Sequence, residues 1–123
     1  MTAAKLLIVE DEKNARQALV DFFSALGYDV ESSATEKDAI QLGKAYQPTL
    51  LISDWLLGDE GQGVTVASTL HELNPRLKII LFSGLPLKAL KAACADLPVT
   101  CFLEKPLSLS VVTEAVNQAL AAG

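Results

Sequence analysis

The sequence contains few of the residue types that build many catalytic and metal sites. Its 123 residues include two cysteines and one histidine. Cys94 and Cys101 do not form a Cys-x-x-Cys motif, and neither is near a second type of metal ligand. A metal or redox site built on these cysteines is therefore not indicated. We expect two reduced thiols that contribute to packing. His71 has no ligand partner at helical spacing, and we expect it at the surface.

Positive charge and long apolar runs are also scarce. Ten Lys and Arg residues stand against fifteen Asp and Glu residues, which gives a formal net charge of −5. This balance disfavours direct binding to nucleic acid or to an anionic membrane, and it favours a protein partner. No apolar run approaches the roughly 20 residues that cross a bilayer. The N-terminal segment lacks the apolar region of a signal peptide. We therefore predict a cytoplasmic protein.

Half of the residues are hydrophobic, and a chain of this length is typical of one domain, which we place at residues 1–123. The apolar residues gather in short runs without alternation, a pattern typical of strands that are buried on both faces of a parallel sheet. The strands are expected at residues 6–9, 50–52, 79–82 and 99–103, with a weaker edge strand at 28–33.

Helical periodicity fills the intervals between these runs. The predicted buried faces are Ala15, Ala18, Leu19, Phe22 and Leu26; Ala39, Leu42, Gly43 and Tyr46; Val66, Ala67, Leu70 and Leu73; and Leu109, Val112, Val116, Ala119 and Leu120. A fourth helix near residues 85–95 is poorly patterned. Helix signals agree with this division, with Thr35 as an N-cap and Gly27 at a C-terminus.

The alternation predicts a doubly wound α/β fold, because parallel strands need right-handed helical crossovers. We expect a five-stranded parallel sheet in the flavodoxin-like order 2-1-3-4-5, built from five strand–helix units. The sequence leaves no room for a second domain. In such a sheet the ligand site lies beyond the carboxyl ends of the strands, where the strand order reverses.

Polar residues follow four of the predicted strands at this edge. They are Glu10 and Asp11 after the first strand, Asp54 after the third, Ser83 after the fourth, and Lys105 with Pro106 after the fifth. The three carboxylates and one ammonium leave a charge of −2, which a hard divalent cation such as Mg²⁺ would balance. A carboxylate beside such a cation is a potential nucleophile toward a phosphoryl group. The sequence therefore predicts phosphoryl chemistry at Asp54.

Four motifs stand at these strand ends in a set order: IVEDE, LISDWLLG, ILFSG and FLEKP. Each motif alone is weak, but the ordered set is specific. From about residue 5 to residue 120 the chain resembles the receiver domain of two-component response regulators. The resemblance implies a phosphorylatable switch, not a conventional enzyme, that assists its own phosphorylation and dephosphorylation. It implies a histidine kinase or phosphotransfer protein as donor and an unidentified downstream protein or output domain.

The resemblance also implies a role for each residue of the motifs. Asp54 is the phosphoacceptor, and Ser83 and Lys105 assist it. Switching is assigned to Ser83 and to Phe102, an aromatic side chain whose other interpretation is ordinary core packing. The implied Mg²⁺ ligands are Glu10, Asp11, Asp54 and the backbone carbonyl of Leu56. A cis peptide is implied before Pro106.

This chain departs from the family pattern in the loop after the acceptor. Gly58 and Gln62 stand where proline and glycine are frequent, and Gly63 suggests a loop that is one residue longer. Leu56 and Leu85 occupy positions that in the family influence the loss of the phosphoryl group. Neither side chain can orient a water molecule by a hydrogen bond, so we predict a persistent phosphoryl group.

Other functions remain open from the sequence. Asp54 could be a solvated acid at a strand end, and Glu10 with Asp11 could complement a helix dipole. A flavodoxin-like cofactor protein shares the topology, but acids after the first strand would repel a phosphate unless a metal ion intervened. A receiver-like interaction module that works without phosphorylation is a third possibility. The chain could act alone or be part of a hybrid kinase or longer regulator, and the sequence does not define its oligomeric state.

Overall fold

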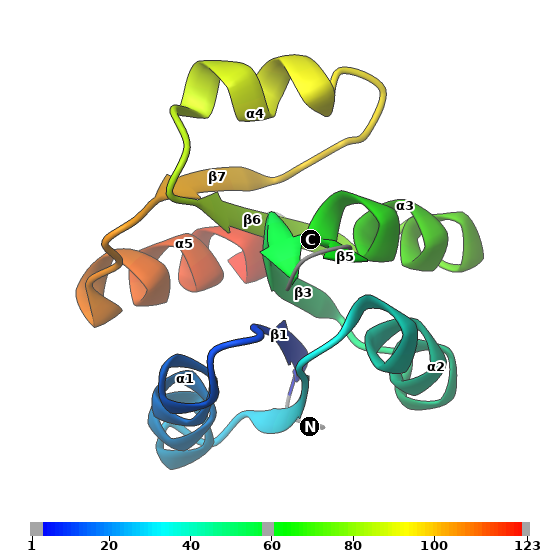
Figure 1. The fold of residues 1–123 in the computed structure, drawn as a ribbon. Coiled ribbons are helices and arrows are strands. Elements are labelled where there is room, and N and C mark those ends of the chain that lie inside the picture. The colour runs from blue at the N-terminus through cyan, green and yellow to red at the C-terminus, as the bar shows by residue number, and fades with distance from the viewer. Residues whose placement is uncertain (1–3, 58–60, 122–123) are drawn as a thin grey trace.

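A parallel five-stranded sheet occupies the centre of the structure, a computed structural model that describes residues 4–57 and 61–121 (Figure 1). The sheet strands are β1 (Lys5–Val9), β2 (Asp29–Ser33), β3 (Leu50–Asp54), β6 (Lys78–Ser83) and β7 (Cys101–Glu104), and β4 (Leu56–Leu57) pairs with β5 (Gly61–Gln62) outside it. The helices are α1 (Lys13–Ala25), α2 (Glu36–Tyr46), α3 (Gly63–Leu73), α4 (Leu87–Ala93) and α5 (Leu109–Ala121).

The sheet order is β2-β1-β3-β6-β7, and all four of these pairings are parallel. If only the strands of this sheet are counted, the order is the predicted 2-1-3-4-5. Strand order reverses between β1 and β3, which are direct neighbours, so the residues that follow these two strands are brought together. The doubly wound α/β prediction is confirmed.

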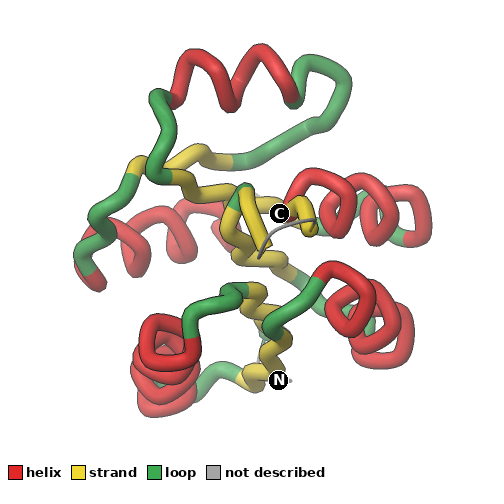
Figure 2. The backbone as a smooth tube through the Cα atoms, viewed as in Figure 1, coloured by secondary structure: helices red, strands yellow, loops and turns green. Residues whose placement is uncertain are grey.

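Two hydrophobic layers cover the two faces of the sheet. In Figure 2 the strands lie between the helices. One layer packs α1 and α5 against the sheet through residues such as Phe23 and Val116. The other packs α2, α3 and α4 against the opposite face through residues such as Leu70 and Leu90. The central strand β3 is buried along its whole length, which includes the predicted apolar run at residues 50–52 and the polar Ser53 and Asp54 that follow it.

The buried face of α1 differs from the prediction. Leu19 and Phe23 are buried and Phe22 is half-buried, whereas the other predicted members of this face are exposed: Ala15, Ala18 and Leu26. Leu19 and Phe23 are four residues apart and so share one face of the helix. Leu26 is the C-cap and lies beyond the last turn, and Gly27 after it has φ +97°, a conformation that glycine adopts without strain. The hydrophobic face therefore ends earlier than the apolar pattern suggests.

Smaller differences occur at the ends of other elements. β7 begins at Cys101, two residues later than predicted, and Leu73 and Leu109 are exposed at the ends of their helices. The predicted N-cap is confirmed, because the backbone N–H of Asp38 donates to the Thr35 hydroxyl at 3.2 Å.

Cys94 and Cys101 are free thiols, and burial raises the pKa of both. Among the described residues, no helix is long and apolar enough to cross a membrane.

Candidate functional site

The carboxyl ends of β1, β3 and β6 and the segment after β7 form the candidate site. Two backbone hydrogen bonds to β6 set the flanking segments in place. The Trp55 N–H donates to the Phe82 carbonyl and the Lys105 N–H donates to the Ser83 carbonyl, both at 2.8 Å. Hydrogen bonds to β6 therefore fix the positions of the first residues after β3 and β7, Trp55 and Lys105.

Asp54 and Lys105 form the closest charged contact of the site. The Lys105 Nζ lies 2.6 Å from Asp54 Oδ2 and 3.7 Å from Glu10 Oε2. Asp54 is only 6% exposed. Burial opposes the charged ammonium, but the hydrogen bond to Asp54 and the nearby carboxylates together raise the pKa of Lys105 above its usual range. The ammonium is thus held in its charged form beside the Asp54 carboxylate.

Glu10 is a buried acid whose hydrogen bonding is incomplete. It is 2% exposed, and its Oε1 accepts a hydrogen bond from the Glu12 N–H at 3.1 Å. Its Oε2 is buried and has no hydrogen-bond partner among the described residues. Burial, together with the charge of Asp54, raises the pKa of Glu10 to about 7. A buried oxygen of this kind is costly unless a proton or a cation occupies the space beside it.

Three carboxylates, including that of Glu10, converge at this edge of the sheet. One carboxylate oxygen from each of Glu10, Asp11 and Asp54 lies within 4.8 Å of the other two. Oxygen ligands about 2.1 Å from one Mg²⁺ lie roughly 3–4 Å apart, so small side-chain adjustments would bring these acids onto one ion. The donor set, which is all oxygen, and the Glu10 oxygen that accepts no hydrogen bond from the described residues both fit a hard divalent cation.

A surface depression of about 330 Å³ opens onto this cluster. Its lining includes Asp54, Ser83 and Lys105, together with Leu56 and Leu85. The Ser83 hydroxyl is buried and accepts a hydrogen bond from the Leu85 N–H at 2.9 Å, which leaves its own hydrogen free to donate to another oxygen. The two leucines are about half exposed and form the apolar rim of the depression.

Phe102 belongs to β7, and Pro106 directly follows Lys105. Phe102 is half-buried against the hydrophobic layer beneath α4, and the Lys91 Nζ lies 5.9 Å from its ring centroid. This placement is compatible both with core packing and with a ring that changes its packing. The Lys105–Pro106 peptide is cis. Gly58, one of the departures from the family pattern, lies outside the described residues.

Two supporting residues were not singled out from the sequence. The Glu12 side chain is the N-cap of α1 and accepts from the N–H groups of Asn14 and Ala15. The Arg16 Nη1 donates to the Glu10 carbonyl oxygen at 2.9 Å. An N-cap is usually Ser, Thr, Asp or Asn, so the glutamate gave no local signal. The Arg16 contact depends on the tertiary position of α1.

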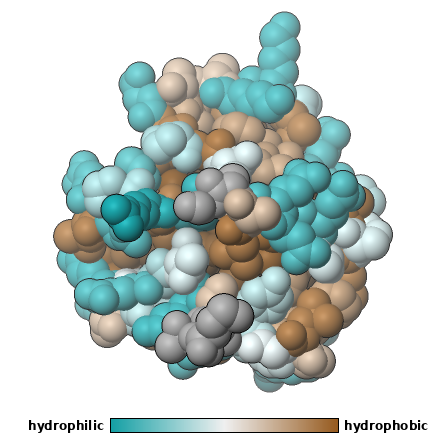
Figure 3. Space-filling view, turned by 180° about the vertical axis from the view of Figure 1, so that it is seen from behind, coloured by the Kyte–Doolittle hydropathy of each residue, from teal (hydrophilic) through white to brown (hydrophobic). Residues whose placement is uncertain are grey.

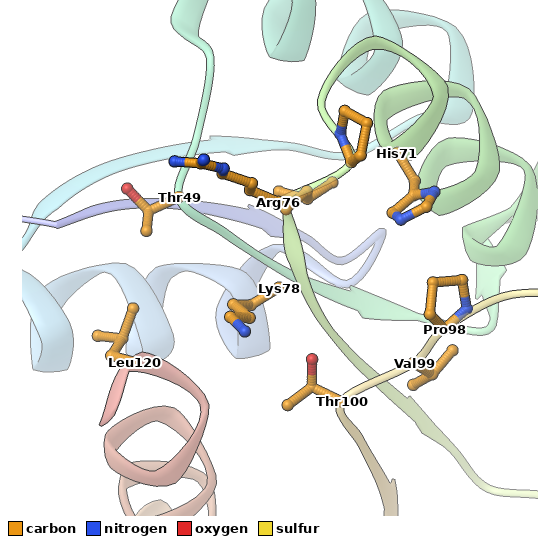
Figure 4. Close-up of a pocket in the computed structure, with 10 residues that line it drawn as sticks. Thr49, His71, Arg76, Lys78, Pro98, Val99, Thr100 and Leu120 are labelled. Carbon is orange, nitrogen blue, oxygen red and sulfur yellow. The ribbon is translucent and has the colours of Figure 1, made fainter. Parts of the chain in front are cut away.

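A larger pocket of about 880 Å³ lies at the opposite edge of the sheet (Figure 4). His71, Arg76 and Lys78 line it with hydroxyl and apolar side chains. Lys78 begins β6 and Ser83 ends it, a separation of about 16 Å at roughly 3.3 Å per residue. This pocket is therefore remote from the carboxylate cluster. Figure 3, which views the molecule from behind, shows hydrophilic and hydrophobic side chains intermixed on that face.

Comparison with known proteins agrees with this arrangement. The sequence pattern of the response regulator receiver domain matches residues 6–117. The chemotaxis protein CheY of Thermotoga maritima is 29% identical over 120 residues, which cover 93% of this chain and 95% of CheY. The photosynthetic apparatus regulatory protein RegA of Rhodovulum sulfidophilum is 30% identical over 111 residues, which cover 90% of this chain and 60% of RegA.

A solved structure shows the same fold. The signal receiver domain of an HD domain-containing protein from Pseudomonas fluorescens superposes with a TM-score of 0.87 and 26% sequence identity. The superposition covers 98% of this chain and 96% of that one. Since the family pattern extends over most of the sequence, the chain belongs to the response regulator receiver domain family of two-component signalling systems.

Proposed function

We propose that Asp54 accepts a phosphoryl group from a histidine kinase or a phosphotransfer protein, and that Mg²⁺ assists the transfer. The observation that carries this proposal is the Lys105 ammonium 2.6 Å from a buried carboxylate that two further acids flank. The arrangement pairs a nucleophile with a fixed positive charge at the place where negative charge would gather. We further propose that residues 1–123 form a single receiver domain.

In this proposal a carboxylate oxygen of Asp54 attacks the phosphorus of a phosphohistidine. The new P–O bond forms as the P–N bond breaks, and the electron pair of the broken bond returns to the imidazole nitrogen. The product is an acyl phosphate on Asp54. Lys105 and the Ser83 hydroxyl then contact the phosphoryl oxygens. Phosphoryl transfer depends mainly on such positioning and charge stabilisation, so the domain needs no further catalytic group of its own.

Glu10, Asp11, Asp54 and the Leu56 carbonyl would hold the Mg²⁺. When bound, the ion neutralises negative charge that develops on the phosphoryl oxygens. The buried Oε2 of Glu10 supports this assignment, because it accepts no hydrogen bond from the described residues, although the Lys105 Nζ lies 3.7 Å away, and a coordinating cation would satisfy it. Asp11 is exposed and lines the depression, so it can adjust to the ion from the solvent side.

Switching would follow from new contacts of the phosphoryl group. Ser83 ends β6 and its hydroxyl accepts from Leu85, so a shift of Ser83 toward a phosphoryl oxygen would displace the segment that leads into α4. Phe102 lies against the layer beneath α4 and could repack in response. The phosphoryl group would thereby favour one of two surface arrangements, which a downstream protein or output domain recognises.

Trp55 offers a direct test, because it follows the acceptor and is half-buried. We expect its fluorescence to change when Mg²⁺ is added, and to change again when beryllofluoride, a phosphoryl mimic, follows. Asp54→Asn should abolish the second change. An equal response of Asp54→Asn and the parent protein would instead favour an interaction module that works without phosphorylation. A yellow preparation would indicate a flavin protein.

A further inference from the structure

The segment between the acceptor strand and α3 contains a short antiparallel pair of strands. Leu56 of β4 lies opposite Gln62 of β5. Gln62 is also the N-cap residue of α3, but its side chain makes no capping hydrogen bond. Leu56 is the residue whose carbonyl is a proposed metal ligand, so the position of Gln62 bears directly on the geometry of that ligand.

Glu36, in the first turn of α2, contacts this pair from outside. The Gln62 N–H donates to Glu36 Oε1 at 2.9 Å, a hydrogen bond between residues that are 26 positions apart. The acceptor is a carboxylate, which forms a stronger hydrogen bond to an N–H than a neutral oxygen does. Glu36 is half-buried, whereas Asp38, the other acid of the same turn, is exposed.

The helix that carries Glu36 is itself held firmly. A Cβ atom at Gly43 of α2 would lie 2.5 Å from a methyl carbon of Leu70 in α3, so the two helices approach closely at this glycine. The Thr35 hydroxyl fixes the start of α2 by accepting from the Asp38 N–H. Glu36 therefore projects from a rigid support toward Gln62.

The residue after Gln62 transmits this position to the acceptor. The Gly63 N–H donates to the Trp55 carbonyl at 2.7 Å. A Cβ atom at Gly63 would lie 1.9 Å from the Asp54 carbonyl oxygen, so the two backbones are in direct contact. A displacement of Gln62 would therefore move the main chain at Asp54 and Trp55.

We propose that Glu36 is a positioning residue for the acceptor site. It holds Gln62 and Gly63 against the end of β3 and so fixes the Leu56 carbonyl relative to the Asp54 carboxylate. Glu36 acts through this main chain and does not itself contact the metal or the reacting atoms. The effect of Glu36 on Mg²⁺ binding rests on the proposed function, whereas the hydrogen bond from Gln62 to Glu36 does not depend on it.

The experiment compares Glu36→Ala, Glu36→Gln and Asp38→Ala with the parent protein. Asp38→Ala is the matched control, because it also removes an acid from the first turn of α2 but leaves the contact with Gln62 intact. Amide hydrogen exchange of Gln62 and Gly63 is measured in metal-free protein. Mg²⁺ affinity is measured by Trp55 fluorescence, and far-UV circular dichroism checks that each variant is folded.

We expect Glu36→Ala to accelerate exchange of the Gln62 amide and to weaken Mg²⁺ binding roughly tenfold, the lower end of the loss that follows removal of an outer-shell partner. Glu36→Gln keeps an acceptor oxygen and should restore most of both properties. If Glu36→Ala and Asp38→Ala behave alike, the proposal is wrong. If the parent protein binds no Mg²⁺, the proposed function fails and the metal consequence fails with it, but the exchange data still decide whether Glu36 holds Gln62.

Discussion

At the scale of single residues, the short contact between Lys105 and Asp54 is the feature on which the proposed chemistry depends most. The ammonium is partly exposed, with 38% of the side-chain surface accessible, so removing it should leave the fold intact. Its charge would stabilise a phosphoryl group in transfer but would oppose the binding of a second cation nearby. The two effects have opposite signs and can be separated by experiment.

Lys105→Ala should therefore lower the rate of phosphorylation by a small donor roughly a hundredfold, the usual loss when one transition-state donor is removed. Mg²⁺ affinity should stay the same or rise, because a competing positive charge has gone. Transfer is measured by intact-mass spectrometry over time, and Mg²⁺ binding by Trp55 fluorescence. Lys88→Ala, at an exposed position on α4, is the control. A parallel loss of transfer and Mg²⁺ affinity would contradict the assigned role.

Glu10 should make the metal-free protein sensitive to pH. Its pKa of about 7 lies above the usual 4.5, so its protonated form is favoured by folding. The stability that this provides is fully present below pH 4.5 and is lost as the pH rises through about 7, a change on the order of 2–3 kcal/mol. Urea unfolding between pH 5 and 8 should show this decline in metal-free protein, and Glu10→Gln should remove it.

Protons and Mg²⁺ should also compete at this carboxylate. Stabilisation by Mg²⁺ is therefore expected to increase between about pH 6 and pH 8 in the parent protein, because more Glu10 is ionised at the higher pH. Glu114→Gln, at an exposed position on α5, serves as the control and should behave like the parent. An Mg²⁺ effect on stability that is equal at both pH values would argue against Glu10 as a ligand.

Leu56 bears on the lifetime of the phosphoryl group. Its side chain is 50% exposed at the rim of the depression and cannot hold a water molecule by a hydrogen bond. Leu56→Asn supplies a donor and an acceptor there. A hydrogen bond to the attacking water worth about 1 kcal/mol would speed dephosphorylation about fivefold. Decay of the adduct is followed by mass spectrometry, and Leu26→Asn, at a similarly exposed leucine that caps the C-terminus of α1, is the control. Equal adduct lifetimes in Leu56→Asn and the parent protein would contradict this prediction.

At the scale of elements, Gly63 joins the start of α3 to the end of β3. A methyl group there would meet the Asp54 backbone oxygen, which cannot move aside as a side-chain tip can. Gly63→Ala should therefore lower the free energy of unfolding by about 1–3 kcal/mol, the usual range for overpacking, and should weaken Mg²⁺ binding. Gly84→Ala is the control for stability, because its Cβ would meet no atom within 4 Å. Equal stabilities would show that the backbones can separate without cost.

The strands could be predicted from the sequence more accurately than the helix faces. A buried parallel strand needs only a continuous apolar run, and the run at residues 50–52 was enough to predict β3. The face of α1 depends on how the helix rolls against the sheet. The apolar residues of α1 allow several choices of buried face. In the structure, Leu19 and Phe23 form that face. The short α4 has too few apolar positions for a clear period.

The site was predictable to the same degree as the topology. Once β1 and β3 are neighbours, Glu10, Asp11 and Asp54 must follow adjacent strand ends, and this requires no knowledge of side-chain contacts. The contacts of Arg16 and Glu36 could not be inferred in this way. Each depends on a helix whose side chain reaches a main-chain atom from another segment, and such contacts leave no local pattern in the sequence.

At the scale of the whole molecule, the acidic excess coincides with the location of the proposed chemistry. Three of the fifteen acids are gathered at one sheet edge, and Lys105 is the cation in ion-pair contact with two of them among the described residues. The opposite edge contains the basic pocket with Arg76 and Lys78. This separation of charge would direct a cation to the end of the sheet where the proposed acceptor, Asp54, lies.

The central claim is that Asp54 becomes phosphorylated with the help of Mg²⁺. The most direct test incubates the parent protein and Asp54→Asn with Mg²⁺ and acetyl phosphate, a small phosphoryl donor, and records intact masses. We predict one phosphoryl adduct on the parent protein and none on Asp54→Asn. Hydroxylamine should remove the adduct, and chelation of Mg²⁺ before the donor is added should prevent it from forming. An adduct of equal yield on both proteins, or none on either protein with any phosphoryl donor including a phosphorylated histidine kinase, would contradict the account.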